Sequence, residues 1–150
     1  MNRPALLSTL WIVLFANYVY CDVLGFYDPT HLTEIMDGGL ENIQFGPGFQ
    51  VAAGALMQIP IMSILLSRVL PRAANRATNV VAAGAMILVQ FGSLFLASDN
   101  APVYIFFSVI EVALLVVVIV AAVTWKKAFA ETTSPMAPAS GSGRTISIWP

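Results

Sequence analysis

The sequence predicts an all-α integral membrane protein: a four-transmembrane-helix up-down antiparallel bundle with a short extracytoplasmic surface helix between its first two spans. Of the 150 residues, 58% are hydrophobic and only 10% are charged, with a mean hydropathy of +0.80. These values are typical of membrane proteins. Four apolar runs are each long enough to cross the roughly 30 Å of a bilayer core at about 1.5 Å per residue. The first and third connections between these runs carry acidic residues and no Lys or Arg, and the second carries three arginines and no acid.

The first predicted span, residues 5–24, follows Arg3 and Pro4 and has the length of a signal peptide. Cleavage would require small residues near the site, and the stretch before residue 22 offers Ala16 alone. Lipoprotein processing at Cys21 would require a small residue where Tyr20 stands. We therefore expect an uncleaved transmembrane helix with an aromatic, polar outer end.

The connection from residue 22 to 48 contains acidic residues and no Lys or Arg. Its acids are Asp22, Asp28, Glu34, Asp37 and Glu41. Asp28 can cap a helix, Pro29 suits the first helical position, and Gly38 with Gly39 supplies a stop. The pattern predicts a short surface helix over 29–37.

Three further spans complete the predicted bundle, at residues 49–67, 79–96 and 103–125. The second contains Gln58 and Pro60, the third contains Gln90, and the fourth contains Glu111. Together with the first span they form one domain, residues 1–127. Residues 128–150 are rich in Ala, Ser, Thr, Pro and Gly, a composition that predicts a disordered cytoplasmic tail.

The charge pattern also predicts the orientation in the membrane. The basic residues lie on one side of the predicted bundle: Arg3, Arg68, Arg72, Arg76, Lys126 and Lys127. The acidic connection and Asp99 lie on the other. By the positive-inside rule both termini are cytoplasmic. The arginines are expected to set this topology and to contact lipid phosphates, and nucleic-acid binding is not expected.

Four polar side chains are predicted to lie at the same depth on four different helices. Counted from the outer boundary at 1.5 Å per residue, Asn17 lies about 10 Å down, Gln58 about 13 Å, Gln90 about 9 Å and Glu111 about 12 Å. Ser108 and Tyr104 lie one and two turns above Glu111 on the same helix face.

This polar layer has two interpretations. In the first, the amides and a neutral Glu111 hydrogen-bond across the bundle and fix the helix register, each bond contributing about 0.6 kcal/mol. In the second, the layer is a binding site or proton site that opens outward, with Asn17, Gln58 and Gln90 orienting a ligand at Glu111. No Lys or Arg lies within the predicted spans, which favours a protonatable acid over an ion pair.

The sequence lacks the residues that several classes of function require. The single Cys21 excludes an intramolecular disulfide, and the single His31 excludes a pair of histidine haem ligands. The sequence has no phosphate-binding Gly-rich loop, nucleophile elbow or zinc spacing, so we expect neither a conventional enzyme nor a cofactor. His31 and Glu34 are weak metal-ligand candidates, because their spacing matches no metal motif and a solvated acidic helix face explains them better.

Three segments resemble a family of uncharacterised small four-pass bacterial inner-membrane proteins, a domain-of-unknown-function family. These segments are Tyr20–Pro29, Gln58–Asn79 and Phe106–Glu111, and the likeness covers Met1–Lys127. The resemblance implies a bacterial inner-membrane location and no known activity. A looser likeness to DoxX-type four-helix membrane proteins is one of architecture and transfers no function.

We therefore expect an outward-opening polar pocket centred on Glu111 that binds or moves a small molecule or proton. The alternative is a non-catalytic accessory or assembly subunit of a larger membrane complex, joined through small-residue helix faces to a second copy or to a partner membrane protein. Convergence of the four polar residues would favour the pocket, and separate faces would favour the subunit.

Overall fold

The computed structural model describes residues 2–40, 43–96 and 102–126. Within those ranges it has five helices and one two-stranded hairpin: α1 (Arg3–Gly25), α2 (Pro29–Met36), β1 (Gly39–Leu40), β2 (Ile43–Gln44), α3 (Pro47–Val69), α4 (Arg72–Leu96) and α5 (Pro102–Val123). The helices α1, α3, α4 and α5 are long and apolar enough to cross a membrane, which confirms the prediction of four such helices. The predicted tail, residues 128–150, lies outside the described residues.

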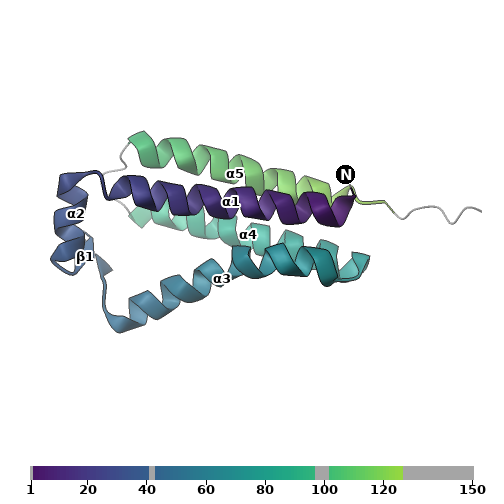
Figure 1. Ribbon diagram of the computed structural model, residues 1–150, viewed down its shortest axis with the longest axis horizontal. Coiled ribbons are helices and arrows are strands. Elements are labelled where there is room, and N and C mark those ends of the chain that lie inside the picture. The colour runs from purple at the N-terminus through teal and green to yellow at the C-terminus, as the bar shows by residue number, and fades with distance from the viewer. Residues whose placement is uncertain (1, 41–42, 97–101, 127–150) are drawn as a thin grey trace, which may run out of the picture.

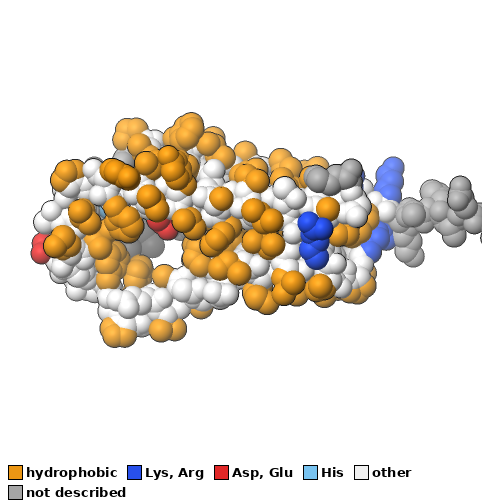
Figure 2. Space-filling model, in the orientation of Figure 1, with side chains coloured by type: hydrophobic (Ala, Val, Ile, Leu, Met, Phe, Trp, Pro, Cys, Tyr) orange, Lys and Arg blue, Asp and Glu red, His pale blue; other side chains and the backbone are white. Residues whose placement is uncertain are grey.

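Three of the long helices lie side by side, and the fourth diverges from them. Figure 1 shows α1, α4 and α5 packed along their lengths, whereas α3 joins them at one end and separates toward the other. Basic side chains gather at the end where α3 joins, and acidic side chains at the opposite end, where α2 lies (Figure 2). We call these the arginine end and the acidic end.

Local capping explains the short helix α2 and the elements next to it. The Asp28 side chain accepts a hydrogen bond of 2.9 Å from the Thr30 N–H, and Pro29 occupies the first turn of α2. The helix stops before Gly38, whose φ of +91° is a conformation that glycine adopts without strain. The chain then forms the β1–β2 hairpin, with Leu40 opposite Ile43. This hairpin is an element that we did not predict.

The fold differs from the sequence-based boundaries most clearly at α4. We expected the third span to begin at about residue 79, but α4 begins at Arg72, directly after the two-residue connection Leu70–Pro71. Asn75 and Asn79 therefore lie inside the helix, and both side chains are buried. Polar residues that would suit a loop are accommodated here because they find partners within the protein.

The core is formed mainly by α1, α4 and α5. Its fully buried side chains include Leu7, Trp11, Leu14, Ala83, Leu115, Val118 and Ala122. The buried residues of α3 are Pro60, Ser63 and Ser67, all in the half of α3 near the arginine end. Figure 1 shows that α3 changes direction part-way along its length, as expected for a helix with an internal proline such as Pro60.

Candidate functional site

Glu111 is the buried acid of the bundle. It lies on the buried face of α5, with only 2% of its surface exposed. Its Oε1 atom is buried and has no hydrogen-bond partner among the described residues. The carboxyl group is close enough to the hydroxyls of Tyr18 and Tyr104 and to the Asp22 carboxyl to interact electrostatically with them. An acid buried between helices without a donor is a costly arrangement that a purely structural role does not require.

The facing part of α1 contributes two more unpartnered polar atoms. The Tyr18 hydroxyl and the Asn17 Oδ1 are both buried, and neither has a hydrogen-bond partner within the described part of the chain. Tyr18 points into the core, since it is 8% exposed. Leaving a buried donor or acceptor unsatisfied costs about 1–3 kcal/mol per group. The region between α1 and α5 therefore contains three buried polar atoms that do not contribute hydrogen bonds to the stability of the fold.

On the α4 side, in contrast, the polar groups are paired. Gln90 Nε2 donates to Ser108 Oγ at 2.7 Å, and the Tyr104 hydroxyl donates to Ser93 Oγ, also at 2.7 Å. Ser93 in turn donates to the Gln90 carbonyl at 2.9 Å. These bonds join α4 to α5 at the acidic end of the interface. We call the set Tyr18, Gln90, Ser93, Tyr104, Ser108 and Glu111 the Glu111 cluster.

Gln58 is the predicted site residue that the structure does not bring to this cluster. It is exposed, on the face of α3 opposite the buried residues Pro60, Ser63 and Ser67. Depth along the helix could be counted from the sequence, but the rotation of α3 about its own axis could not. Of the six predicted residues, Gln90, Ser108, Tyr104 and Glu111 lie in the cluster. Asn17 lies beside it.

A second buried polar network lies nearer the arginine end, and the sequence analysis missed it. Asn79 Oδ1 accepts from Trp11 Nε1 at 2.6 Å and from Ser67 Oγ at 3.1 Å. Asn79 Nδ2 donates to Asn75 Oδ1 at 2.8 Å, and Asn75 Nδ2 donates to the Ser67 carbonyl at 2.7 Å. The network ties α1, α3 and α4 together, and we call it the Asn79 network. The spacing of four between the two asparagines, which puts them on one helix face, was the available signal.

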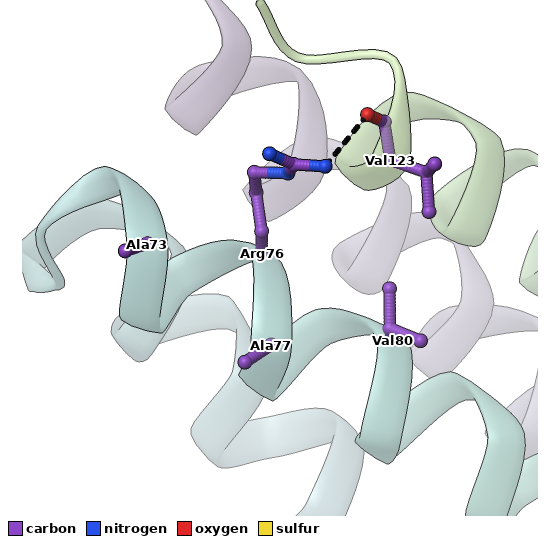
Figure 3. A pocket seen from close by; sticks show the side chains of 5 residues that line it. All are labelled: Ala73, Arg76, Ala77, Val80 and Val123. Atoms are coloured by element: carbon purple, nitrogen blue, oxygen red, sulfur yellow. Dashed lines mark hydrogen bonds between the residues drawn. The ribbon is translucent and has the colours of Figure 1, made fainter.

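The arginines have a structural role in addition to the predicted topological one. Arg76 donates from Nε to the Ala122 carbonyl at 2.9 Å. It also donates from Nη2 to the Val123 carbonyl at 2.9 Å, the bond drawn in Figure 3. Arg72 donates to the Trp125 carbonyl, and Arg3 donates to the Ala121 carbonyl at 3.3 Å. The last carbonyls of a helix have no partner within it, and its C-terminus attracts cations. The arginines therefore cap α5 from α1 and α4.

The remaining candidate sites are weaker. Within the described ranges, no group of three or more His, Cys, Asp or Glu side chains could hold a metal ion, so His31 and Glu34 gain no further ligand there. Two shallow hollows of about 370 and 400 Å³ lie on the surface of α4, one of them shown in Figure 3. Glu111 lines neither hollow.

Comparison with known proteins identifies the family. The model of a family of unknown function, DUF6326, matches residues 1–132. The chain belongs to this family. No curated protein and no solved structure matched the chain. The family assignment agrees with the resemblance to a domain of unknown function, and it supplies no activity, so the function must be argued from the Glu111 cluster.

Proposed function

We propose that the protein is a proton-responsive protein of the bacterial inner membrane, with the arginine end in the cytoplasm and Glu111 as the group that binds and releases the proton. The orientation rests on the positive-inside rule, because every described Lys and Arg side chain lies at the arginine end. The bacterial location rests on the resemblance to small four-pass bacterial proteins.

The single observation that supports a proton site is the unpartnered, buried Oε1 of Glu111. An ionisable side chain inside a membrane bundle is usually functional, and a structural one normally has a counter-ion. The basic side chains of the described chain are at the arginine end, away from Glu111. A proton is the one ligand that needs no cavity, which suits an acid that is 2% exposed and packed between helices.

Access to Glu111 differs on its two sides. Toward the acidic end, Asp22 is exposed on α1, one helical turn beyond Tyr18, and it interacts electrostatically with Glu111. Toward the arginine end, the apolar core side chains Leu14, Leu115 and Val118 are fully buried. A proton can therefore reach Glu111 by way of Asp22 far more readily than it can cross the core. This asymmetry favours a proton-binding switch over a through-going proton channel.

The proposal can be tested by infrared difference spectroscopy of the protein in lipid bilayers, between acidic and alkaline buffer. A protonated carboxyl group has a carbonyl band that shifts in heavy water. We expect a Glu111 component of this band in the parent protein and the loss of that component in Glu111→Gln, which keeps the shape of the side chain and removes the titrating proton. Glu34→Gln is the matched control: it removes a carboxyl group of α2 and should leave the band in place.

The contradicting outcome is equally direct. If Glu111→Gln retains the complete pH-dependent carboxyl signal, Glu111 does not exchange its proton and the proposed function fails. Thermal stability of the same variants separates a folding defect from a loss of titration. Glu111→Gln should unfold at nearly the parent temperature, because the neutral amide has nearly the size and shape of the neutral carboxyl group that it replaces.

A further inference from the structure

One exposed stripe runs along α3 and has a heptad-like spacing. Its members follow one another at intervals of four, three, four and three residues: Val51, Ala55, Gln58, Met62 and Leu65. All five are exposed, and they lie on the face of α3 opposite the buried Pro60, Ser63 and Ser67. We call this set the Gln58 stripe. It faces away from the bundle, toward whatever surrounds α3 in the membrane.

Gln58 stands out within this apolar stripe. It is the middle residue of α3, with eleven residues on each side between Pro47 and Val69, so it lies about 16 Å from either end of the helix. Its side chain carries two N–H donors and one acceptor oxygen. None of them forms a hydrogen bond within the described residues 2–40, 43–96 and 102–126. Hydrocarbon offers no partner, so an amide at this depth is costly unless another polypeptide pairs with it.

We propose that the Gln58 stripe is the interface of a homodimer, in which α3 of one copy packs against α3 of a second copy and the two Gln58 side chains hydrogen-bond to each other. The amide group is self-complementary, since each N–H can donate to the other copy's oxygen. Two copies inserted in the same orientation have Gln58 at the same depth. A two-fold axis along the membrane normal therefore brings the two amides together.

The other residues of the Gln58 stripe also suit packing against α3 of a second copy. A 4-3-4-3 spacing is the seam of a left-handed helix pair, and a single polar residue in such a seam fixes register and partner number. Ala55 and the neighbouring Gly54 are small and exposed, which lets two backbones approach closely. The stripe contains no charge, so a charged partner finds no complement there. A lipid head group lies at the bilayer surface, too far from the middle of α3 to pair with Gln58.

Cysteine cross-linking in native membranes tests the interface directly. In a Cys21→Ser background, single cysteines at Val51, Ala55, Met62 and Leu65 should give disulfide-linked dimers of twice the chain mass. Matched controls are Met57 and Ile64 on other faces of α3, and Leu88, which is 74% exposed on α4. These three positions should cross-link weakly. Equal cross-linking at the controls, or linkage to a different polypeptide, would overturn the proposal.

A second experiment measures the contribution of the amide. Gln58→Leu should lower the dimer association constant in bilayers about three- to thirtyfold, the range expected for intramembrane polar contacts, whereas Gln58→Asn should retain much of it. Single-molecule photobleaching at varied protein-to-lipid ratio gives the association constant. Because Gln58 is exposed, neither variant disturbs the bundle, which circular dichroism can verify. A parent protein that is monomeric at every ratio, or a Gln58→Leu protein that dimerises as well as the parent, refutes the interface.

Discussion

Asn79 is the residue that joins three helices at the arginine half of the bundle. Its side chain accepts two hydrogen bonds and donates to Asn75, so its removal leaves the Trp11 N–H and the Ser67 hydroxyl without their acceptor. A buried polar group that loses its only partner costs about 1–3 kcal/mol. The Asn79 network is therefore the most sensitive polar feature of the fold.

We predict that Asn79→Leu lowers the free energy of unfolding by about 2–4 kcal/mol, since more than one partner is left unsatisfied. Unfolding of the detergent-solubilised protein, followed by circular dichroism and tryptophan fluorescence, measures the loss. Thr78→Ala is the control, because Thr78 directly precedes Asn79 on α4 but lines a surface hollow and takes no part in the Asn79 network. Equal losses for the two variants would show that the network does not hold the helices together.

The sequence predicted which polar residues matter better than it predicted which residues they contact. Glu111 and Gln90 stood out because polar groups are rare in apolar runs, and the structure buries both. Gln58 stood out for the same reason, but it faces outward. The sequence of α3 does not record which face meets α1 and α4, so this orientation could not be predicted. The Asn79 network was missed because Asn75, which lies between two arginines, was assigned to the connection and Asn79 to the first residue of the third span.

At the scale of the element, the end of α5 depends on side chains from other helices. The last carbonyls of α5 accept hydrogen bonds from Arg3 and Arg76, and the Trp125 carbonyl just beyond the helix accepts from Arg72. Arg76 alone makes two of these bonds, from a half-buried position where solvent screens the interaction less than at the surface. The four long helices and their order could be predicted from hydropathy. This capping could not, because it joins residues about 50 to 120 positions apart.

We predict that Arg76→Gln destabilises the last turn of α5 by about 1–2 kcal/mol. Hydrogen exchange measured by mass spectrometry should become faster in the peptide that contains Val120 and Val123 and stay unchanged at the start of α5. Arg68→Gln is the control, because Arg68 is exposed and lies at the end of α3. A last turn that exchanges at the parent rate in Arg76→Gln would show that capping by Arg3 and Arg72 suffices.

At the scale of the whole molecule, the separation of charge between the two ends predicts one orientation in the membrane. In a Cys21→Ser background, a cysteine at Thr30 on α2 should react with an impermeant maleimide in intact cells. A cysteine at Ala73 at the start of α4 should react only after permeabilisation, since both positions are exposed and only their sides differ. Reaction at Ala73 alone would invert the orientation.

The capping of α5 also determines when the molecule can be completed during its synthesis. Arg3 is synthesised more than a hundred residues before its acceptors Ala121 and Thr124. Until α5 is in place, the guanidinium groups of Arg3, Arg72 and Arg76 therefore contact water or lipid head groups instead of these carbonyls. A chain stopped before residue 121 would lack the carbonyl groups that accept from all three arginines.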